Sequence, residues 1–229
     1  MKKQILVAGI AALAMSPFAQ AEIGIYVTPK LGPSLVETSF SYAGSYRSGE
    51  IGSHDKSSPV LGVAAGYDFY RKFSVPFRVE VEVASIGTTE EKRYLARYNE
   101  NIKTTLWGST FFANAYLDVH NSSAFTPYVG LGVGTSYLAA KGRATNNIGE
   151  ERFREEKTSS ANFAWNVGVG GTWKFSNRFA LDLGYRYANL GDVKTKRARN
   201  RRGSPVRDYW METEDVKTHQ FLFGARFNF

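Results

Sequence analysis

The chain has 229 residues, which suits one domain or a small pair, and its 29 basic and 21 acidic side chains give a formal net charge of +8. It contains no cysteine, which excludes disulfides, thiolate metal sites and cysteine nucleophiles. Its hydrophobic content of 43% is ordinary, so composition alone would suit a soluble globular domain.

The first residues have the order of an export signal. Lys2 and Lys3 precede an apolar run at 5–15, and the triplet Ala19-Gln20-Ala21 follows it. We therefore expect residues 1–21 to be a signal peptide that is cleaved after Ala21, and residues 22–229 to form the exported domain. Beyond Ala21 no apolar run approaches the ~20 residues of a membrane-spanning helix, which excludes a helical membrane protein but not a membrane β-barrel.

Eight segments of the exported part alternate apolar residues with small or charged ones at every second position, which is the period of a β-strand. In 77–84, for example, Val79 and Val81 alternate with Glu80 and Glu82. The expected strands are 23–32, 60–69, 77–84, 107–119, 128–137, 162–174, 179–187 and 220–229. In each strand one face is aliphatic or aromatic, and the other is glycine, small or charged.

The connections between these segments alternate in length. Those at 70–76, 120–125 and 176–178 are short, and those at 36–58, 87–103, 138–159 and 190–214 are long. Tight periplasmic turns and long external loops are typical of outer-membrane barrels. Residues 22–229 are therefore predicted to be an all-β, eight-stranded antiparallel up-and-down transmembrane β-barrel with four long extracellular loops and both chain ends in the periplasm.

Aromatic residues fall at two levels of the expected strands, as they do in the girdles at the two membrane interfaces. The periplasmic level holds Phe69, Phe77, Tyr128, Trp173, Phe175, Phe179, Phe227 and Phe229. The outer level holds Trp107, Tyr137, Phe163, Trp165, Tyr185 and Tyr187. A soluble sandwich would place its aromatic residues at mid-strand, so the two levels favour a membrane barrel.

Three strand motifs are informative beyond their period: Tyr128-Val-Gly-Leu-Gly-Val-Gly134, Leu181-Asp-Leu-Gly-Tyr-Arg-Tyr187 and Phe221-Leu-Phe-Gly-Ala-Arg-Phe-Asn-Phe229. They resemble the opacity-like and surface-antigen family of small Gram-negative outer-membrane β-barrels, which is similar in form to the membrane domain of outer-membrane protein A. The resemblance covers the whole exported part and implies an outer-membrane location. It also implies that the barrel-assembly machinery reads the C-terminal aromatic residues as its signal.

The inward face of the predicted barrel carries charges of both signs. The expected salt-bridge network comprises Lys30, Arg78, Glu80, Glu82, Asp182, Arg186 and Arg226, with Asp68 and Asp118 on the same face. The interior of an eight-stranded barrel is only wide enough for side chains, and buried charges need partners, so we expect a packed plug. A narrow gated pore and acid–base catalysis by Glu80 and Glu82 are the alternatives.

The three histidines, His54, His120 and His219, fall at different levels, so neither a shared metal site nor a cofactor is expected. His120 and Ser122 have the His-x-Ser spacing seen in barrel lipid deacylases. They fall at a periplasmic turn, however, which is the wrong side for a lipid of the outer leaflet. We therefore expect no enzymatic activity.

The segment from Val193 to Arg207, in the fourth long loop, is strongly basic. Its bases are Lys194, Lys196, Arg197, Arg199, Arg201, Arg202 and Arg207, with no acid between Asp192 and Asp208. Export removes nucleic acid as a partner, whereas arginine pairs well with sulfate and phosphate and the clustered spacing resembles that of heparin binders. A solvated loop that only neutralises neighbouring lipopolysaccharide is the alternative.

Together these features predict an adhesin- or invasin-like outer-membrane surface protein whose loops bind host glycosaminoglycans or surface receptors. Tyr42 and Tyr46 of the first long loop are candidate contact anchors. The alternatives are a structural membrane component that interacts with lipopolysaccharide, a narrow pore, and a lipid-modifying enzyme. Outer-membrane lipid and lipopolysaccharide are expected partners throughout.

Overall fold

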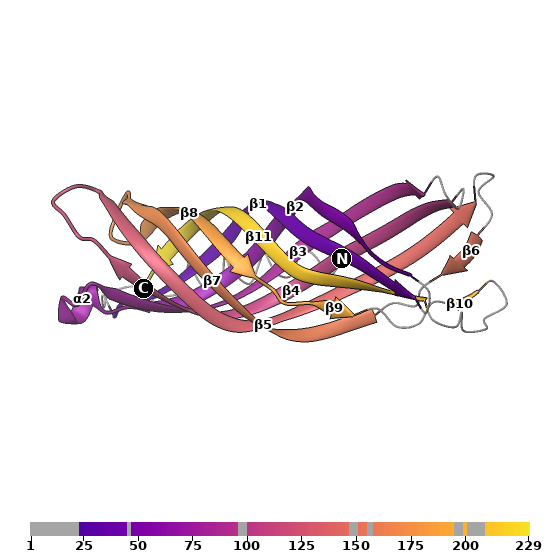
Figure 1. Cartoon of the computed structure of the whole chain (residues 1–229). Helices are drawn as coiled ribbons and strands as arrows, with labels where there is room; N and C mark the ends of the chain where they lie inside the picture. The colour runs from indigo at the N-terminus through magenta and orange to yellow at the C-terminus, as the bar shows by residue number, and fades with distance from the viewer. Residues whose placement is uncertain are drawn as a thin grey trace, which may run out of the picture.

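The computed structural model describes residues 23–44, 47–95, 100–146, 151–154, 158–194, 199–200 and 209–229. Eight long antiparallel strands close into a barrel (Figure 1). In order around the barrel they are β1 (Ile25–Gly44), β2 (Arg47–Asp68), β3 (Phe77–Leu95), β4 (Glu100–Asp118), β5 (Phe125–Asn146), β7 (Thr158–Lys174), β8 (Phe179–Asn189) and β11 (Tyr209–Asn228), which pairs with β1. The other elements are the helical turn α2 (Tyr70–Phe73) and the short strands β6 (Glu151–Arg154), β9 (Val193–Lys194) and β10 (Arg199–Asn200). The predicted eight-stranded up-and-down barrel is confirmed.

The strands continue much further at the extracellular end than the sequence indicates. β1 and β2 stay paired as far as Gly44 and Arg47, and β3 and β4 as far as Leu95 and Glu100. Most of the described residues of 36–58 and 87–103 are therefore paired strand, so the long extracellular connections predicted there are built largely from extended strands. The pairing continues because each further residue pair closes backbone hydrogen bonds once the membrane part has fixed the register, whether or not the residues keep an apolar period.

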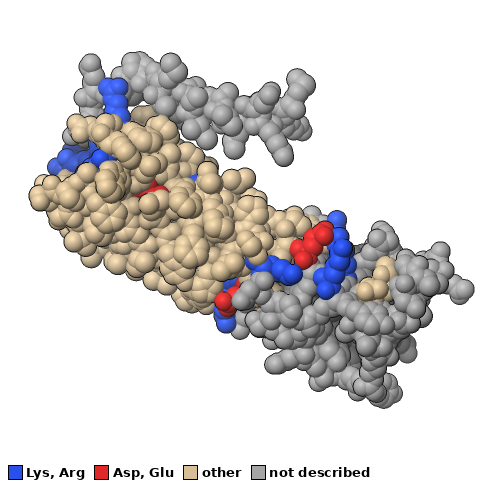
Figure 2. Space-filling model, turned by 90° about the horizontal axis from the view of Figure 1, so that it is seen from above, with Lys and Arg blue, Asp and Glu red and all other residues tan. Residues whose placement is uncertain are grey.

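The outward face of the strands forms an apolar band. Leu31, Leu61 and Leu131 are 57%, 63% and 62% exposed. Figure 2 shows the middle of one side of the barrel almost entirely free of charged side chains, which gather toward the two ends. On β4 this band extends from Leu117 to Trp107, which at an ordinary strand tilt corresponds to about 25 Å along the barrel axis. This height matches the apolar thickness of an outer membrane. Such a surface is stable against acyl chains rather than water.

Among the described residues, no helix has the length and apolar character needed to cross a bilayer.

The barrel interior has two layers. The periplasmic half is charged, whereas the extracellular half is filled by a hydrophobic cluster of inward-facing side chains. The members of this cluster are Val36, Val60, Ala84, Ile86, Leu106, Phe112, Leu138, Ala140, Ala164, Ala188, Leu190 and Val216. Phe112 and Leu190 are fully buried. The charged layer is thus separated from the extracellular side by packed apolar side chains.

Tyr128 belongs to the interior and not to the periplasmic girdle in which the sequence placed it. The guanidinium of Arg78 lies 4.5 Å from the centroid of the Tyr128 ring. Gly170 leaves room for this ring, because a Cβ atom at Gly170 would lie 2.5 Å from Tyr128 Cζ. Tyr128 and Gly130 are two residues apart in β5, so they lie on the same, inward face of the strand.

The helical turn α2 lies at the periplasmic end of the barrel (Figure 1). Its Tyr70 ring stacks on His120 of the next turn, with centroids 3.5 Å apart. Arg71 Nη2 donates a hydrogen bond of 3.1 Å to the backbone oxygen of Asn177 in the third turn. Ser74 ends the turn with φ of 54°, in the left-handed region. The three periplasmic turns are therefore joined to one another.

Candidate functional site

The charged layer of the interior is centred on Glu82. Lys30 Nζ lies 2.7 Å from Glu82 Oε2, and Arg186 Nη1 lies 2.7 Å from Glu82 Oε1. Lys30 also donates to Glu80, which accepts a 3.1 Å hydrogen bond from the Tyr116 hydroxyl. Both carboxylates that could serve acid–base chemistry therefore have fixed partners, and the arrangement is that of a structural network.

Two further ion pairs complete this layer. Arg226 holds Asp182 through both oxygens, with Nη2–Oδ1 at 2.8 Å and Nε–Oδ2 at 3.0 Å. Arg78 Nε donates to Asp118 Oδ1 at 3.0 Å, and the Arg78 guanidinium lies 4.2 Å from the centroid of the Tyr116 ring. The structure thus places all seven residues of the expected network inside the barrel and adds Asp118.

The charges of this layer balance, and little space remains between them. The bases Lys30, Arg78, Arg186 and Arg226 face the acids Glu80, Glu82, Asp118 and Asp182. The cavity that Lys30, Arg78, Glu80 and Arg186 help to line has a volume of about 40 Å³, which holds a few water molecules at most. In the part of the chain that the structure describes, the charged layer is packed around this small cavity, which favours a plug over a passage for solutes.

The fourth extracellular connection starts from an anchored turn. Leu190 is buried in the hydrophobic cluster, and its backbone oxygen accepts a hydrogen bond from the Ser136 hydroxyl. The backbone oxygen of Asp192 accepts a 2.8 Å hydrogen bond from Asn162 Nδ2. Between them Gly191 has φ of 77°, and a Cβ there would lie 2.6 Å from Asn162 Cβ, so glycine is required. The basic segment therefore leaves the barrel at a fixed point.

The backbone register brings further arginines beside this basic segment. Arg199 in β10 pairs with Arg154 in β6, and Arg154 pairs with Arg143 in β5. Three arginines thus occupy paired positions on three neighbouring strands, which we call the arginine row. Lys194 in β9 pairs with Glu212 in β11. Lys196, Arg197, Arg201, Arg202 and Arg207 lie outside the described residues, as does Tyr46.

The sequence analysis did not single out Arg143 or Arg154. They are separated by more than ten residues in sequence, so only the strand pairing shows that they belong with Arg199. The signal that could have drawn attention to them is their position in the mixed-charge third loop, where Glu150, Glu151, Glu155 and Glu156 mask the local excess of bases.

A second basic patch lies at the outer membrane interface on β3, β4 and β5. Lys103 Nζ is 2.8 Å from Glu90 Oε1, and this hydrogen bond, together with the charge of Lys92, lowers the pKa of the Glu90 carboxyl from its ordinary value. Lys141 Nζ lies 5.4 Å from the centroid of the Trp107 ring. Three lysines and one glutamate therefore stand just above a girdle tryptophan. We call these five residues the interfacial lysine patch.

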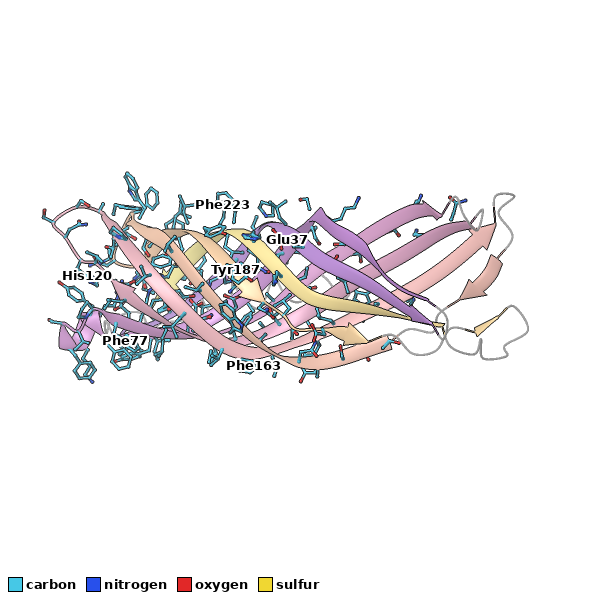
Figure 3. The ribbon with its side chains drawn as sticks, in the orientation of Figure 1. Glu37, Phe77, His120, Phe163, Tyr187 and Phe223 are labelled. Carbon is cyan, nitrogen blue, oxygen red and sulfur yellow. The ribbon has the colours of Figure 1, made fainter. Side chains whose placement is uncertain are left out.

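A polar cluster lies on the outward face of the opposite side of the barrel, where Figure 3 labels Glu37 and Tyr187. The Tyr185 hydroxyl is 2.6 Å from His219 Nδ1, and His219 Nε2 is 3.1 Å from Glu37 Oε1. The Tyr187 ring packs edge-on against His219, with centroids 5.3 Å apart. His219 of β11 faces the lipid side, as its position in the sequence indicates, and the structure supplies it with partners from two neighbouring strands, β8 and β1.

His120 and His219 lie at different ends of the membrane part of the barrel. His120 stacks on Tyr70 at the periplasmic end, whereas His219 lies at the outer girdle, and the side chain of His54 is not among those described. Within the described ranges, no group of three His, Cys, Asp or Glu side chains could hold a metal ion. His120 and Ser122 lie in the periplasmic turn between β4 and β5.

Comparisons with known proteins agree with this geometry. A family model described as "Outer membrane protein beta-barrel domain" matches residues 5–229. "Outer membrane protein PagN" of Salmonella typhimurium is 31% identical over 233 residues, which covers 95% of this chain and 95% of that protein. An uncharacterised protein of Brucella abortus is 28% identical over 151 residues, which covers 59% of this chain and 52% of that protein.

Among solved structures, the outer membrane protein OprG from Pseudomonas aeruginosa superposes with a TM-score of 0.53 at 14% identity, over 90% of this chain and 97% of that one. This similarity shows the fold alone, whereas the family match and the PagN relative show the family to which the chain belongs. The chain therefore belongs to the outer-membrane protein β-barrel family and resides in the outer membrane of a bacterium.

Proposed function

We propose that this barrel is an adhesin- or invasin-like surface protein that binds sulfated or phosphorylated polyanions, such as host glycosaminoglycans, at its extracellular end. The arginine row is the observation that supports this most strongly. Like charges at paired positions of neighbouring strands destabilise a sheet unless an anion lies between or over them. A sulfated chain would supply such anions in series, and arginine binds each sulfate through two parallel hydrogen bonds.

The fold favours this role in a second way. The basic segment of 194–207 leaves the barrel at the anchored Leu190–Asp192 turn, and β10 joins it to the arginine row. Because the barrel is rigid, part of the entropy that a free loop would lose on binding is lost during folding instead. The proposal includes no catalytic step, in line with the expectation from the sequence.

Binding to immobilised heparin tests this function. The folded protein in detergent should be retained at low salt and released by a salt gradient, because contacts between exposed charges are screened. A chain that passes through the column at low salt while folded would contradict the proposal.

A second candidate function is anchoring to lipopolysaccharide, which the interfacial lysine patch favours. Lys92, Lys103 and Lys141 stand at the level where the phosphates of the outer leaflet lie, above the ring of Trp107. An aromatic ring at the interface with cations above it suits a phosphorylated glycolipid.

We expect Lys103→Gln with Lys141→Gln to weaken binding of lipopolysaccharide about 30-fold, since each cation near an anionic membrane surface contributes about 1 kcal/mol. The measurement is the rise in the unfolding temperature of the barrel when lipopolysaccharide is added. Dephosphorylated lipopolysaccharide should produce no such rise with either protein. An equal rise in the wild type and the double variant would exclude this patch as the anchor.

A further inference from the structure

The periplasmic end of the barrel carries a group of bases that no extracellular function uses. We call Arg71, Lys72, Lys174 and Arg178 the basic rim. Arg71 reaches from α2 to the Asn177 oxygen in the turn between β7 and β8, so the two parts of the rim belong to one surface. Figure 2 shows blue side chains gathered at this end, which is the end that bears α2 in Figure 1.

The exposed charge of this surface is positive. Asp68 and Asp118, the acidic side chains nearest this end among the described residues, are only 6% and 5% exposed. Asp118 is paired with Arg78, and Asp68 Oδ2 lies 3.7 Å from Arg71 Nε. The three described periplasmic turns, 69–76, 119–124 and 175–178, contain no acidic residue. Lys72 and Lys174 are exposed, so their charges act outward.

Large apolar side chains lie directly beside these bases. Phe73, Val75 and Phe175 are 55%, 47% and 61% exposed, although they stand at the water side of the strands. The Phe73 ring lies 6.3 Å from Phe69 in the aromatic girdle, and Lys72 Nζ is 5.5 Å from the centroid of the Phe73 ring. The surface thus has exposed apolar side chains that continue from the aromatic girdle and ammonium groups next to them, an arrangement that suits a lipid interface.

We propose that the basic rim binds the headgroups of anionic phospholipids, such as phosphatidylglycerol, in the inner leaflet of the outer membrane. A phospholipid offers both parts of the required partner, since its phosphate faces the lysines and its acyl chains cover Phe73, Val75 and Phe175. Peptidoglycan also carries carboxylates, but it has no apolar part that would cover these side chains. The rim would fix the depth of the barrel from below, whereas the interfacial lysine patch acts from above.

A photoactivatable phospholipid tests this proposal with positional information. The folded full chain is placed in bilayers that contain a trace of phosphatidylglycerol or phosphatidylcholine with the same photoreactive acyl chain, and labelled peptides are counted by mass spectrometry. In the wild type, we expect the phosphatidylglycerol probe to label segments 69–77 and 173–179 far more than the phosphatidylcholine probe does. Lys72→Gln with Lys174→Gln should reduce that preference about 30-fold, which corresponds to about fivefold for each cation.

The matched control is Lys103→Gln with Lys141→Gln, which removes two lysines at the other end of the barrel and should leave labelling of 69–77 and 173–179 unchanged. A heat-modifiable gel shift shows that each variant is folded. Equal labelling by the two probes in the wild type would overturn the proposal, as would an unchanged preference in the rim variant. Binding to peptidoglycan sacculi without any preference for phosphatidylglycerol would also overturn it and would assign the rim to the cell wall instead.

Discussion

Replacing Glu82 with leucine is expected to lower the free energy of unfolding by about 3–5 kcal/mol, because the change leaves two buried cations without their shared carboxylate. Lys30 Nζ and Arg186 Nη1 both lie 2.7 Å from this carboxylate, and the Glu82 side chain is 1% exposed. Glu80 remains as a direct partner for Lys30, whereas Arg186 keeps hydrogen bonds to the neutral Gln220 and loses its direct carboxylate partner. The measurement is equilibrium unfolding by urea in lipid vesicles, followed by tryptophan fluorescence.

Two controls separate this effect from a general loss of packing. Glu90→Leu removes a carboxylate from an exposed pair with Lys103 and should change the unfolding midpoint little, since exposed ion pairs contribute little. Adding Arg186→Leu to Glu82→Leu should recover part of the stability, because a buried charge without a partner is removed. If Glu82→Leu alone were as stable as the wild type, the interior charges would be solvated and the plug would be an open, wet lumen.

Replacing Lys196, Arg197, Arg199, Arg201 and Arg202 with serine is expected to abolish retention on heparin at low salt. Five charge-assisted contacts at ~0.6 kcal/mol each correspond to about 100-fold weaker binding. Arg143→Gln with Arg154→Gln should have a smaller effect in the same direction, because it removes two members of the arginine row and leaves the basic segment intact. The measurement is the salt concentration that releases each folded variant.

The control for this series is Lys72→Gln with Lys174→Gln, which removes two charges at the periplasmic end and should elute with the wild type. Retention of the five-serine variant at the wild-type salt concentration would reject the basic segment as the binder. Loss of retention in the periplasmic variant would show that heparin binding depends on the net charge of the chain and not on a defined surface.

The fold was accessible from the sequence because one physical constraint acts on every residue of the membrane part. Side chains such as Leu31 and Leu131 must face acyl chains, while their neighbours Lys30 and Gly130 must fit inside a narrow barrel, so the period of two is strict. The same parity predicts an inward direction for all seven residues of the interior network. Beyond Leu35 the alternation in β1 is less strict, because apolar Val36 follows Leu35 directly, so the sequence did not show that the strand continues to Gly44.

The residues that were misassigned or missed have three separate causes. Tyr128 is aromatic and near a strand end, but parity outweighs residue type and turns it toward Arg78. The hydrophobic cluster around Phe112 and Leu190 was not foreseen, because apolar residues on the inward face contradict the simple rule of a polar interior. The partners of His219 come from β8 and β1, so only the closed barrel brings Glu37 and Tyr185 to it.

The candidate binding surface was half visible in the sequence. A run such as Arg197 to Arg202 is recognisable by composition alone, since no acidic residue interrupts it. The contribution of Arg143 and Arg154 depends on pairing between β5, β6 and β10, which is a long-range property of the sheet. A run of bases in the sequence shows only the charge of neighbouring residues, whereas a binding surface contains charged residues from several strands that are distant in sequence.

The central claim is that alternate residues of each strand touch lipid while their neighbours fill a closed interior. Nuclear Overhauser effects between leucine and valine methyl groups and acyl-chain protons, measured in lipid nanodiscs without any substitution, test this directly. The outward methyl groups of Leu31, Leu61, Leu131, Val133 and Val167 should show strong effects, and the inward ones of Val36, Val60, Leu138, Leu190 and Val216 should show none. Comparable effects in both groups, or their absence from the outward group, would contradict the arrangement on which every proposal above depends.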